Sequence, residues 1–158
     1  MSEKVFTLGE IEPIIDEVLD SGSEISLMAS GVSMEPYIRD KTDKITLVKV
    51  SRELKKGDVP LYKRDNGKFV LHRIVGIGDE GYIMRGDNQW VTEYPVKKSS
   101  IKAVLKSVER NGKVFSADGA YSKLYSLFLP AIRFRRKMMN FIKYRYNKHF
   151  KSRRKDIK

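Results

Sequence analysis

The stretch Gly31-Val32-Ser33-Met34-Glu35-Pro36 is the part of the sequence around which we expect the fold to be organised. Pro36 restricts its own φ and disfavours helical backbone at the residue before it, while Gly31 allows the chain to bend. A stiff turn of this kind holds the hydroxyl of Ser33 in a defined place. Because serine is also common in turns without chemical function, its significance depends on the rest of the chain.

A histidine and two acids that could activate Ser33 follow it in the sequence. A serine hydroxyl needs a base within hydrogen-bonding reach to act as a nucleophile. His72 lies in the alternating, β-branched run 69–75, which predicts a strand that would hold the imidazole rigidly. Asp87 and Glu93 come next, and either could orient the imidazole.

Four short motifs, in this order, resemble those of the signal peptidase superfamily, which also contains the self-cleaving repressors. They are Gly-x-Ser-Met-x-Pro at 31–36, Gly57-Asp58-Val59, His72-Arg73 and Gly86-Asp87-Asn88. The resemblance covers about residues 26–104. Some branches use lysine as the base, whereas histidine followed by arginine is typical of the endoplasmic-reticulum and archaeal enzymes. The resemblance therefore implies a serine peptidase in which Ser33 is the nucleophile and His72 the base.

The resemblance also bears on the acid that orients the histidine. In the histidine branch this acid usually lies a few residues beyond Gly-Asp-Asn, an offset that falls on Glu93, where the family commonly has aspartate. Asp87 is the other candidate, and its alternative role is to tie the strands beside the site together. We expect Met34 to line the substrate groove, and Asp58 and Arg73 to be structural.

Most of the net positive charge lies near the C-terminus. The 158 residues carry a net charge of +12. Residues 130–158 contain twelve Lys or Arg and one acid, a net +11, whereas residues 1–129 contain twenty basic and nineteen acidic side chains, a net +1. This imbalance predicts an anionic partner for the tail. The absence of cysteine excludes disulfide bonds and thiolate metal sites, and we expect no metal ion or cofactor.

The sequence predicts no transmembrane segment. The longest charge-free runs are residues 25–34 and 124–132, whereas a spanning helix needs about 20 apolar residues. The first residues also lack the apolar core of a signal peptide. Most signal peptidases have a transmembrane anchor, so this chain differs from them. We expect a cytoplasmic protein that binds peripherally to the inner face of the membrane.

The chain divides into three predicted parts, of which residues 1–22 are an N-terminal helix packed on the body. Thr7 and Glu10 form a capping box, and apolar side chains at helical spacing predict a helix from Leu8 to about Asp20. The alternative is that this helix substitutes for the missing membrane anchor.

The second part, residues 23–118, contains many short strand patterns and is therefore predicted to be mainly β. Asn66-Gly67 and Asn111-Gly112 are strong hairpin signals. The family resemblance implies a compact, coiled β domain with its active site in a groove. The predicted strands are residues 24–29, 44–50, 59–62, 69–75, 82–84, 101–109 and 113–116.

The third part, residues 119–158, is predicted to be a basic amphipathic helical tail. Apolar side chains recur at helical spacing from Tyr121, and Lys and Arg occupy much of the other face. Pro130 is expected to kink or split the helix. We expect residues 121–158 to bind an anionic membrane surface. The alternatives are packing on the β domain and, less favoured, binding to nucleic acid. His149 is expected to be a solvated side chain.

We therefore expect a serine endopeptidase of signal peptidase type that cleaves a leader or signal segment of a peptide or preprotein. The alternative is a non-catalytic module that retains the fold and binds peptide or lipid. Self-cleavage, as in the repressors, is disfavoured because histidine stands at the base position. In addition, about thirty residues before the site are too few for a DNA-binding domain. The sequence indicates neither the cleavage rule nor the oligomeric state.

Overall fold

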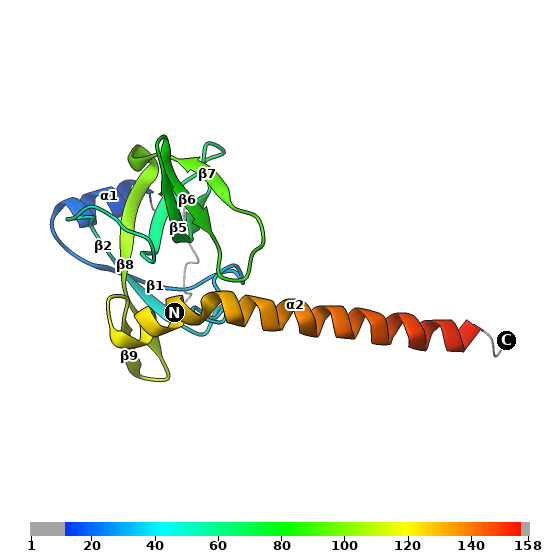
Figure 1. Ribbon diagram of the computed structural model, residues 1–158. Helices are drawn as coiled ribbons and strands as arrows, with labels where there is room; N and C mark the ends of the chain where they lie inside the picture. Colours follow the sequence, from blue (N-terminus) through cyan, green and yellow to red (C-terminus); the bar gives the residue numbers. More distant parts are fainter. Residues whose placement is uncertain (1–11, 156–158) are drawn as a thin grey trace. The chain divides into compact units, whose positions relative to one another are not determined.

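The computed structural model describes residues 12–155 and is mainly β, with a helix before the strands and a long helix after them (Figure 1). The first helix, α1, spans Glu12–Asp20. This range agrees with the corresponding part of the helix predicted from Leu8 to about Asp20. The predicted helix start at Leu8 and the capping box of Thr7 and Glu10 lie outside the described residues. Side-chain burial is described for residues 15–139 and 141–146.

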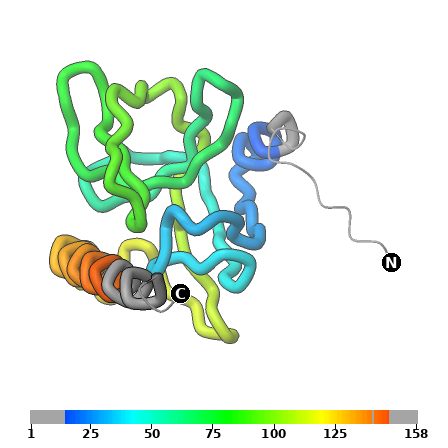
Figure 2. The backbone as a smooth tube through the Cα atoms, turned by 90° about the vertical axis from the view of Figure 1, so that its right-hand side faces the viewer, coloured from blue at the N-terminus to red at the C-terminus, as the bar shows by residue number. Residues whose placement is uncertain are grey.

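The larger of two antiparallel sheets has six strands in the order β1-β2-β8-β3-β4, with β9 also paired to β8. The longest strand, β8, lies at the centre and joins β2 to β3. The sheet is bent rather than flat, and the backbone curls as it passes through it (Figure 2). Its strands are β1 (Ile25–Met28), β2 (Lys44–Val48), β3 (Pro60–Lys63), β4 (Phe69–Leu71), β8 (Ile101–Arg110) and β9 (Lys113–Ser116).

The smaller sheet consists of β5 (Arg73–Gly78), β6 (Gly81–Arg85) and β7 (Glu93–Val96), in that order. A short 3-10 helix, η1 (Lys98–Ser100), leads from β7 to β8. Strand β7 was not predicted, because Pro95 interrupts its pattern and proline is confined to edge strands and bulges. It does form the edge of this sheet. Except for β4 and β5, the other strands agree with the prediction apart from their ends, and so do both Asn-Gly hairpins.

A hydrophobic core fills the space between the two sheets. Tyr62 comes from the larger sheet, while Ile74 and Met84 come from the smaller one, and each of the three is at most 1% exposed. Buried and less buried residues alternate along β6, as expected for a strand with one face on the core. The core cluster comprises Leu54, Tyr62, Ile74, Tyr82, Met84 and Val96.

The chain passes from one sheet to the other at His72, so the prediction of one continuous strand over 69–75 is wrong. Leu71 in β4 pairs with Leu61 in the larger sheet, and Arg73 in β5 pairs with Arg85 in the smaller one. The break falls on the single residue between them. The N–H of His72 still donates to the carbonyl of Pro60 at 3.4 Å, and the N–H of Ile74 donates to the carbonyl of Asp58 at 2.8 Å. His72 therefore stays bonded to β3 where the chain changes sheets.

The C-terminal helix, α2, runs without interruption over Ala120–Lys155 and contains Pro130. The predicted split at this proline is wrong, because the missing N–H removes only one hydrogen bond of a long ladder that continues on both sides. The chain forms two compact units, with the boundary between Leu124 and Tyr125 inside this helix. Among the described residues, no helix combines the length and apolarity needed to cross a membrane.

Candidate active site

Ser33 lies in the turn that follows β1, and its backbone is held by the loop after β6. Gly31 has a φ of +101°, as the predicted bend requires, and its N–H donates to Asp40 Oδ1 at 2.7 Å. The carbonyl of Ser33 accepts a hydrogen bond from the backbone N–H of Asn88 at 2.8 Å. The Asn88 side chain donates to the carbonyl of Val32 at 3.0 Å. The turn is therefore fixed by contacts distant in sequence.

His72 is almost completely buried, with 1% of its surface exposed. Its Nδ1 lies 3.0 Å from Glu93 Oε1 and 3.2 Å from the hydroxyl of Tyr62. An ionised Glu93 can only accept a hydrogen bond, so Nδ1 carries the proton of the neutral imidazole and Nε2 is left with a lone pair. This is the tautomer that a general base requires.

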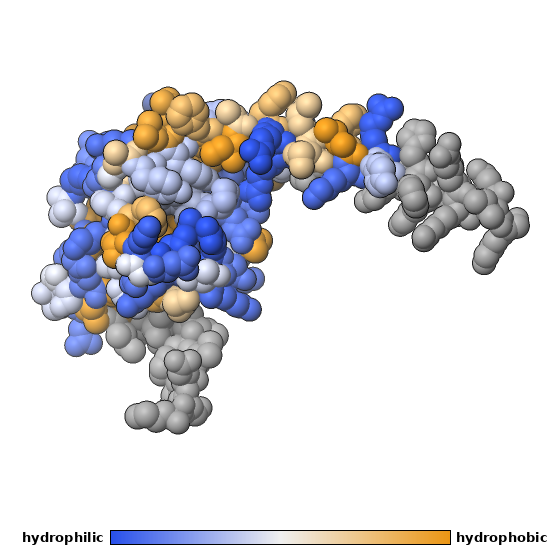
Figure 3. Space-filling view, turned by 90° about the horizontal axis from the view of Figure 1, so that it is seen from below, coloured by the Kyte–Doolittle hydropathy of each residue, from blue (hydrophilic) through white to orange (hydrophobic). Residues whose placement is uncertain are grey.

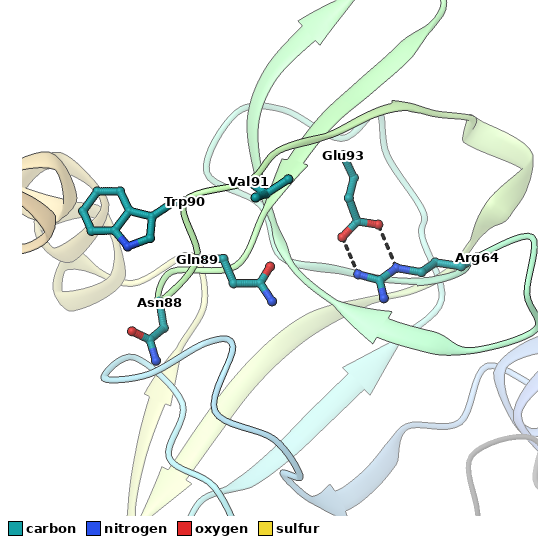
Figure 4. Close-up of a pocket in the computed structure, with 6 residues that line it drawn as sticks. All are labelled: Arg64, Asn88, Gln89, Trp90, Val91 and Glu93. Atoms are coloured by element: carbon teal, nitrogen blue, oxygen red, sulfur yellow. Dashed lines mark hydrogen bonds and ion pairs between the residues drawn. The ribbon is translucent and has the colours of Figure 1, made fainter.

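Glu93, the first residue of β7, also accepts two hydrogen bonds from Arg64. Arg64 Nε donates to Oε2 at 2.8 Å, and Nη2 donates to Oε1 at 2.5 Å (Figure 4). Partial burial by itself would raise the pKa of Glu93, but the hydrogen bonds from Arg64 and Tyr62 outweigh it, so the pKa is lowered. Glu93 is therefore a carboxylate at neutral pH, in contact with the imidazole.

Burial also lowers the pKa of His72, because it penalises the charged imidazolium. The negative charge of Glu93 acts in the opposite direction, and the positive charge of Arg64 adds to the lowering. Since the ordinary value is 6.5, His72 is neutral and able to accept a proton at neutral pH.

Asp87, the second acid predicted for this role, pairs with Arg73 instead. The guanidinium donates to both carboxylate oxygens, at 2.9 and 2.7 Å, and also to the carbonyl of Gly57. Asp87 and Arg73 are both buried, and the guanidinium stacks 4.5 Å above the ring of Tyr37. Asp87 thus ties the loop after β6 to β5, and Glu93 is the acid that contacts His72.

Asp58, which we expected to be structural, is held in a similar way. It accepts two hydrogen bonds from Arg52 and one from the backbone N–H of Lys55. These bonds hold the loop before β3 together. Asp58 is not among the charges that shift the pKa of His72.

The segments that carry Ser33 and His72 both lead to the end of β6. Arg73, the residue after His72, pairs with Arg85, the residue before Gly86. A Cβ on Gly86 would lie only 2.7 Å from the Ser33 carbonyl oxygen. Within the described residues, no hydrogen bond joins Ser33 Oγ to the imidazole; such bonds are often long in enzymes without substrate.

An open cavity of about 620 Å³ adjoins the Arg64–Glu93 pair. Trp90 and Val91 supply apolar surface and are 58% and 76% exposed. The close-up shows these residues following one another along the loop that faces the ion pair (Figure 4). The lining residues are Arg64, Asn88, Gln89, Trp90, Val91 and Glu93.

Met34 does not lie in this lining, and only 3% of it is exposed. Met34 is thus a core residue next to the Ser33 turn, and its predicted place in a substrate groove stays a prediction. The side chain of His149 lies outside the described set.

Sequence reasoning missed Arg64 and Tyr62, although a signal for both was present. Tyr62 lies in β3 and Arg64 directly follows this strand, two residues on, so their side chains point to the same side of the extended chain. Both contact Glu93. A basic and an aromatic residue alternating ahead of an Asn-Gly hairpin could have indicated a polar cluster, but nothing local pointed to Glu93 as their partner.

The described residues contain no cluster of three His, Cys, Asp or Glu side chains suited to a metal ion. Comparison with models of known protein families and with curated protein sequences gives no match. The arrangement of the side chains is therefore the basis for a functional assignment.

Proposed function

We propose that the protein is a serine endopeptidase of the signal peptidase type, with Ser33 as nucleophile, His72 as general base and Glu93 as orienting acid. The observation that carries the proposal is the 3.0 Å contact between Glu93 Oε1 and Nδ1 of a buried imidazole. This contact leaves Nε2 as the basic atom. The proposal is also supported by Gly86, which packs against the Ser33 turn and directly follows Arg85, the pairing partner of Arg73.

In the proposed reaction, Ser33 Oγ attacks a peptide carbonyl while His72 Nε2 takes the hydroxyl proton. The imidazolium is stabilised by Glu93 and passes its proton to the leaving amine, so the C–N bond breaks and an acyl-enzyme remains. Water then attacks the ester, again with His72 as base, and releases the acid product. Arg64 acts as a positioning residue, because it holds both oxygens of Glu93.

The proposed substrate is the leader or signal segment of a peptide or preprotein. An extended peptide crossing the Ser33 turn would find the cavity beside Trp90 and Val91 open to one of its side chains. The exposed aromatic and aliphatic surface favours an apolar side chain at that position.

The test is a comparison of protein N-termini in cells that carry the wild-type protein, Ser33→Ala or Ser30→Ala. Ser30 is exposed and lies three residues before the candidate nucleophile, so it is a matched control. We expect a set of N-termini that is present with wild type and Ser30→Ala and is reduced at least about 10³-fold with Ser33→Ala. Their flanking residues would supply the cleavage rule.

A non-catalytic module that binds peptide or lipid is the second candidate. It is favoured by the absence of a hydrogen bond from Ser33 Oγ to the imidazole within the described residues and by the near-complete burial of His72. If the three maps of N-termini coincide while all three proteins are folded and equally abundant, the peptidase proposal is wrong and this alternative stands.

A further inference from the structure

An apolar stripe lies exposed along the second half of α2. Leu127, Phe134 and Phe141 are 70%, 66% and 57% exposed. These three residues are seven positions apart, which is close to two helical turns, so they lie on one face of the helix. The space-filling view shows apolar side chains exposed along this helix among charged ones (Figure 3). The stripe consists of Leu127, Phe128, Ala131, Phe134, Met138, Phe141 and Ile142.

The same helix carries only positive charge. Between residues 125 and 155 the sequence has eleven Lys or Arg and no Asp or Glu. Most of the basic residues, the exposed Lys137 and Lys143 among them, fall outside the stripe. Arg135 and Arg145 fall within it or at its end, and the Arg145 guanidinium lies 5.9 Å from the centre of the Phe141 ring. Long basic side chains of this kind can extend along apolar surface and keep their charge in a polar layer.

We propose that this stripe inserts into the interface of an anionic lipid bilayer, with the helix lying parallel to the membrane surface. An interfacial helix buries its apolar face about 5–10 Å deep and holds its basic side chains at the level of the lipid phosphates. One partner, the anionic bilayer, would thus cover the apolar stripe and neutralise the positive charge of α2. The inference concerns this helix alone and does not depend on the peptidase proposal.

Two other occupants fit the surface less well. A second copy of the helix would cover the apolar stripe, but it would bring eleven further positive charges close by, with no acidic side chain in the segment to pair with them. A nucleic acid would neutralise the charge but would leave Leu127, Phe134 and Phe141 in water. Charge complementarity together with apolar exposure therefore selects the anionic membrane.

The test measures co-sedimentation of the full-length protein with phosphatidylcholine vesicles, with and without phosphatidylserine. The variants are Phe134→Gln and Tyr144→Gln. Phe134 and Tyr144 are both 66% exposed, and neither change alters the charge. Tyr144 lies ten residues further along, about 80° round the helix from Phe134 and about 120° from the middle of the stripe, so it is outside the stripe. We expect binding only to the phosphatidylserine vesicles, about tenfold weaker for Phe134→Gln and unchanged for Tyr144→Gln.

Equal effects of the two substitutions, or equal binding to both kinds of vesicle, would overturn the proposal. So would a dimer in sedimentation velocity that Phe134→Gln dissociates, because the stripe would then be a contact between copies. Circular dichroism checks that helix content is unchanged in each variant. Met138→Gln, also in the stripe, replaces Phe134→Gln if that protein loses helix, and it must reproduce the loss of binding.

Discussion

Arg64 is not one of the three proposed Ser-His-acid residues, but it affects two of them. It fixes both oxygens of Glu93 and places a positive charge near His72. Arginine can donate to both oxygens of a carboxylate at once, whereas lysine carries the same charge on a single nitrogen. The two functions of Arg64, charge and alignment, can therefore be separated by substitution.

For Arg64→Gln, we expect the acid limb of the kcat/KM profile to move to higher pH and kcat to fall by about tenfold. The sign follows from the charge: Arg64 lowers the pKa of His72, so its removal raises that pKa, and the base is then protonated at a higher pH. Arg64→Lys keeps the charge and loses the alignment, so kcat should fall while the limb stays in place. A limb that does not move in Arg64→Gln would show that the charge does not act on His72.

At the level of turns and strands, the position of Ser33 depends on how closely its turn packs on the loop after β6. A Cβ atom on Gly86 would lie 2.7 Å from the Ser33 carbonyl oxygen and 3.1 Å from the side-chain amide of Gln89. Gly86 does not have a positive φ. Glycine is therefore required here because it lacks a Cβ, which allows the two backbones to approach each other closely.

We expect Gly86→Ala to reduce kcat/KM by about 10²-fold, since it displaces the Ser33 turn from the base. Gly76→Ala is the control: its Cβ would meet only the end of the Ile83 side chain, at 3.1 Å, and a flexible side chain can move. Both proteins should keep their circular dichroism spectra. Activity in Gly86→Ala equal to that in Gly76→Ala would contradict the proposed alignment of Ser33 and His72.

The elements that sequence predicts well are those whose signals are local. Short apolar and β-branched runs and the Asn-Gly pairs identify β2, β3, β8 and β9, and Gly31 is in the bent conformation that its position suggested. What sequence could not provide is the partner of each segment. The break at His72 exists because Leu71 and Arg73 pair in different sheets, and β7 exists because β6 offers an open edge.

The same limit applies to the candidate site. The sequence named Ser33 and His72 from their motifs and left the choice between Asp87 and Glu93 open. The choice follows from Arg73, which engages Asp87 completely, and from Arg64, which turns Glu93 toward the imidazole. Both are long-range contacts, with residues 14 and 29 positions apart.

For the protein as a whole, acid should reduce the free energy of unfolding in two stages. Burial lowers the pKa of His72 from 6.5, so the unfolded chain takes up a proton below that pH before the folded one does. Burial tends to raise the pKa values of Asp43, Asp58 and Glu93, but arginine partners outweigh it and lower them from 3.8, 3.8 and 4.5. For every one of these groups, stability is lost as the pH falls.

Urea unfolding at pH values from about 8 to 3 measures both stages. We expect stability to begin falling near the ordinary histidine pKa and to fall more steeply below the ordinary carboxyl values. His72→Asn should remove the first stage and leave the second. Stability that stays constant or rises between pH ~7 and ~5 in the wild-type protein would contradict the neutral, buried state of His72.

The central place of β8 also determines when the candidate site can first exist. Strands β2 and β3 are neighbours of β8 and not of each other, so a ribosome must release residues up to about Arg110 before the larger sheet can close. Ser33 and His72 emerge long before that point, and Glu93 only shortly before it. A nascent chain therefore carries Ser33 and His72 without an assembled site while residues 73 to about 110 are made, and the candidate site forms in one step after that.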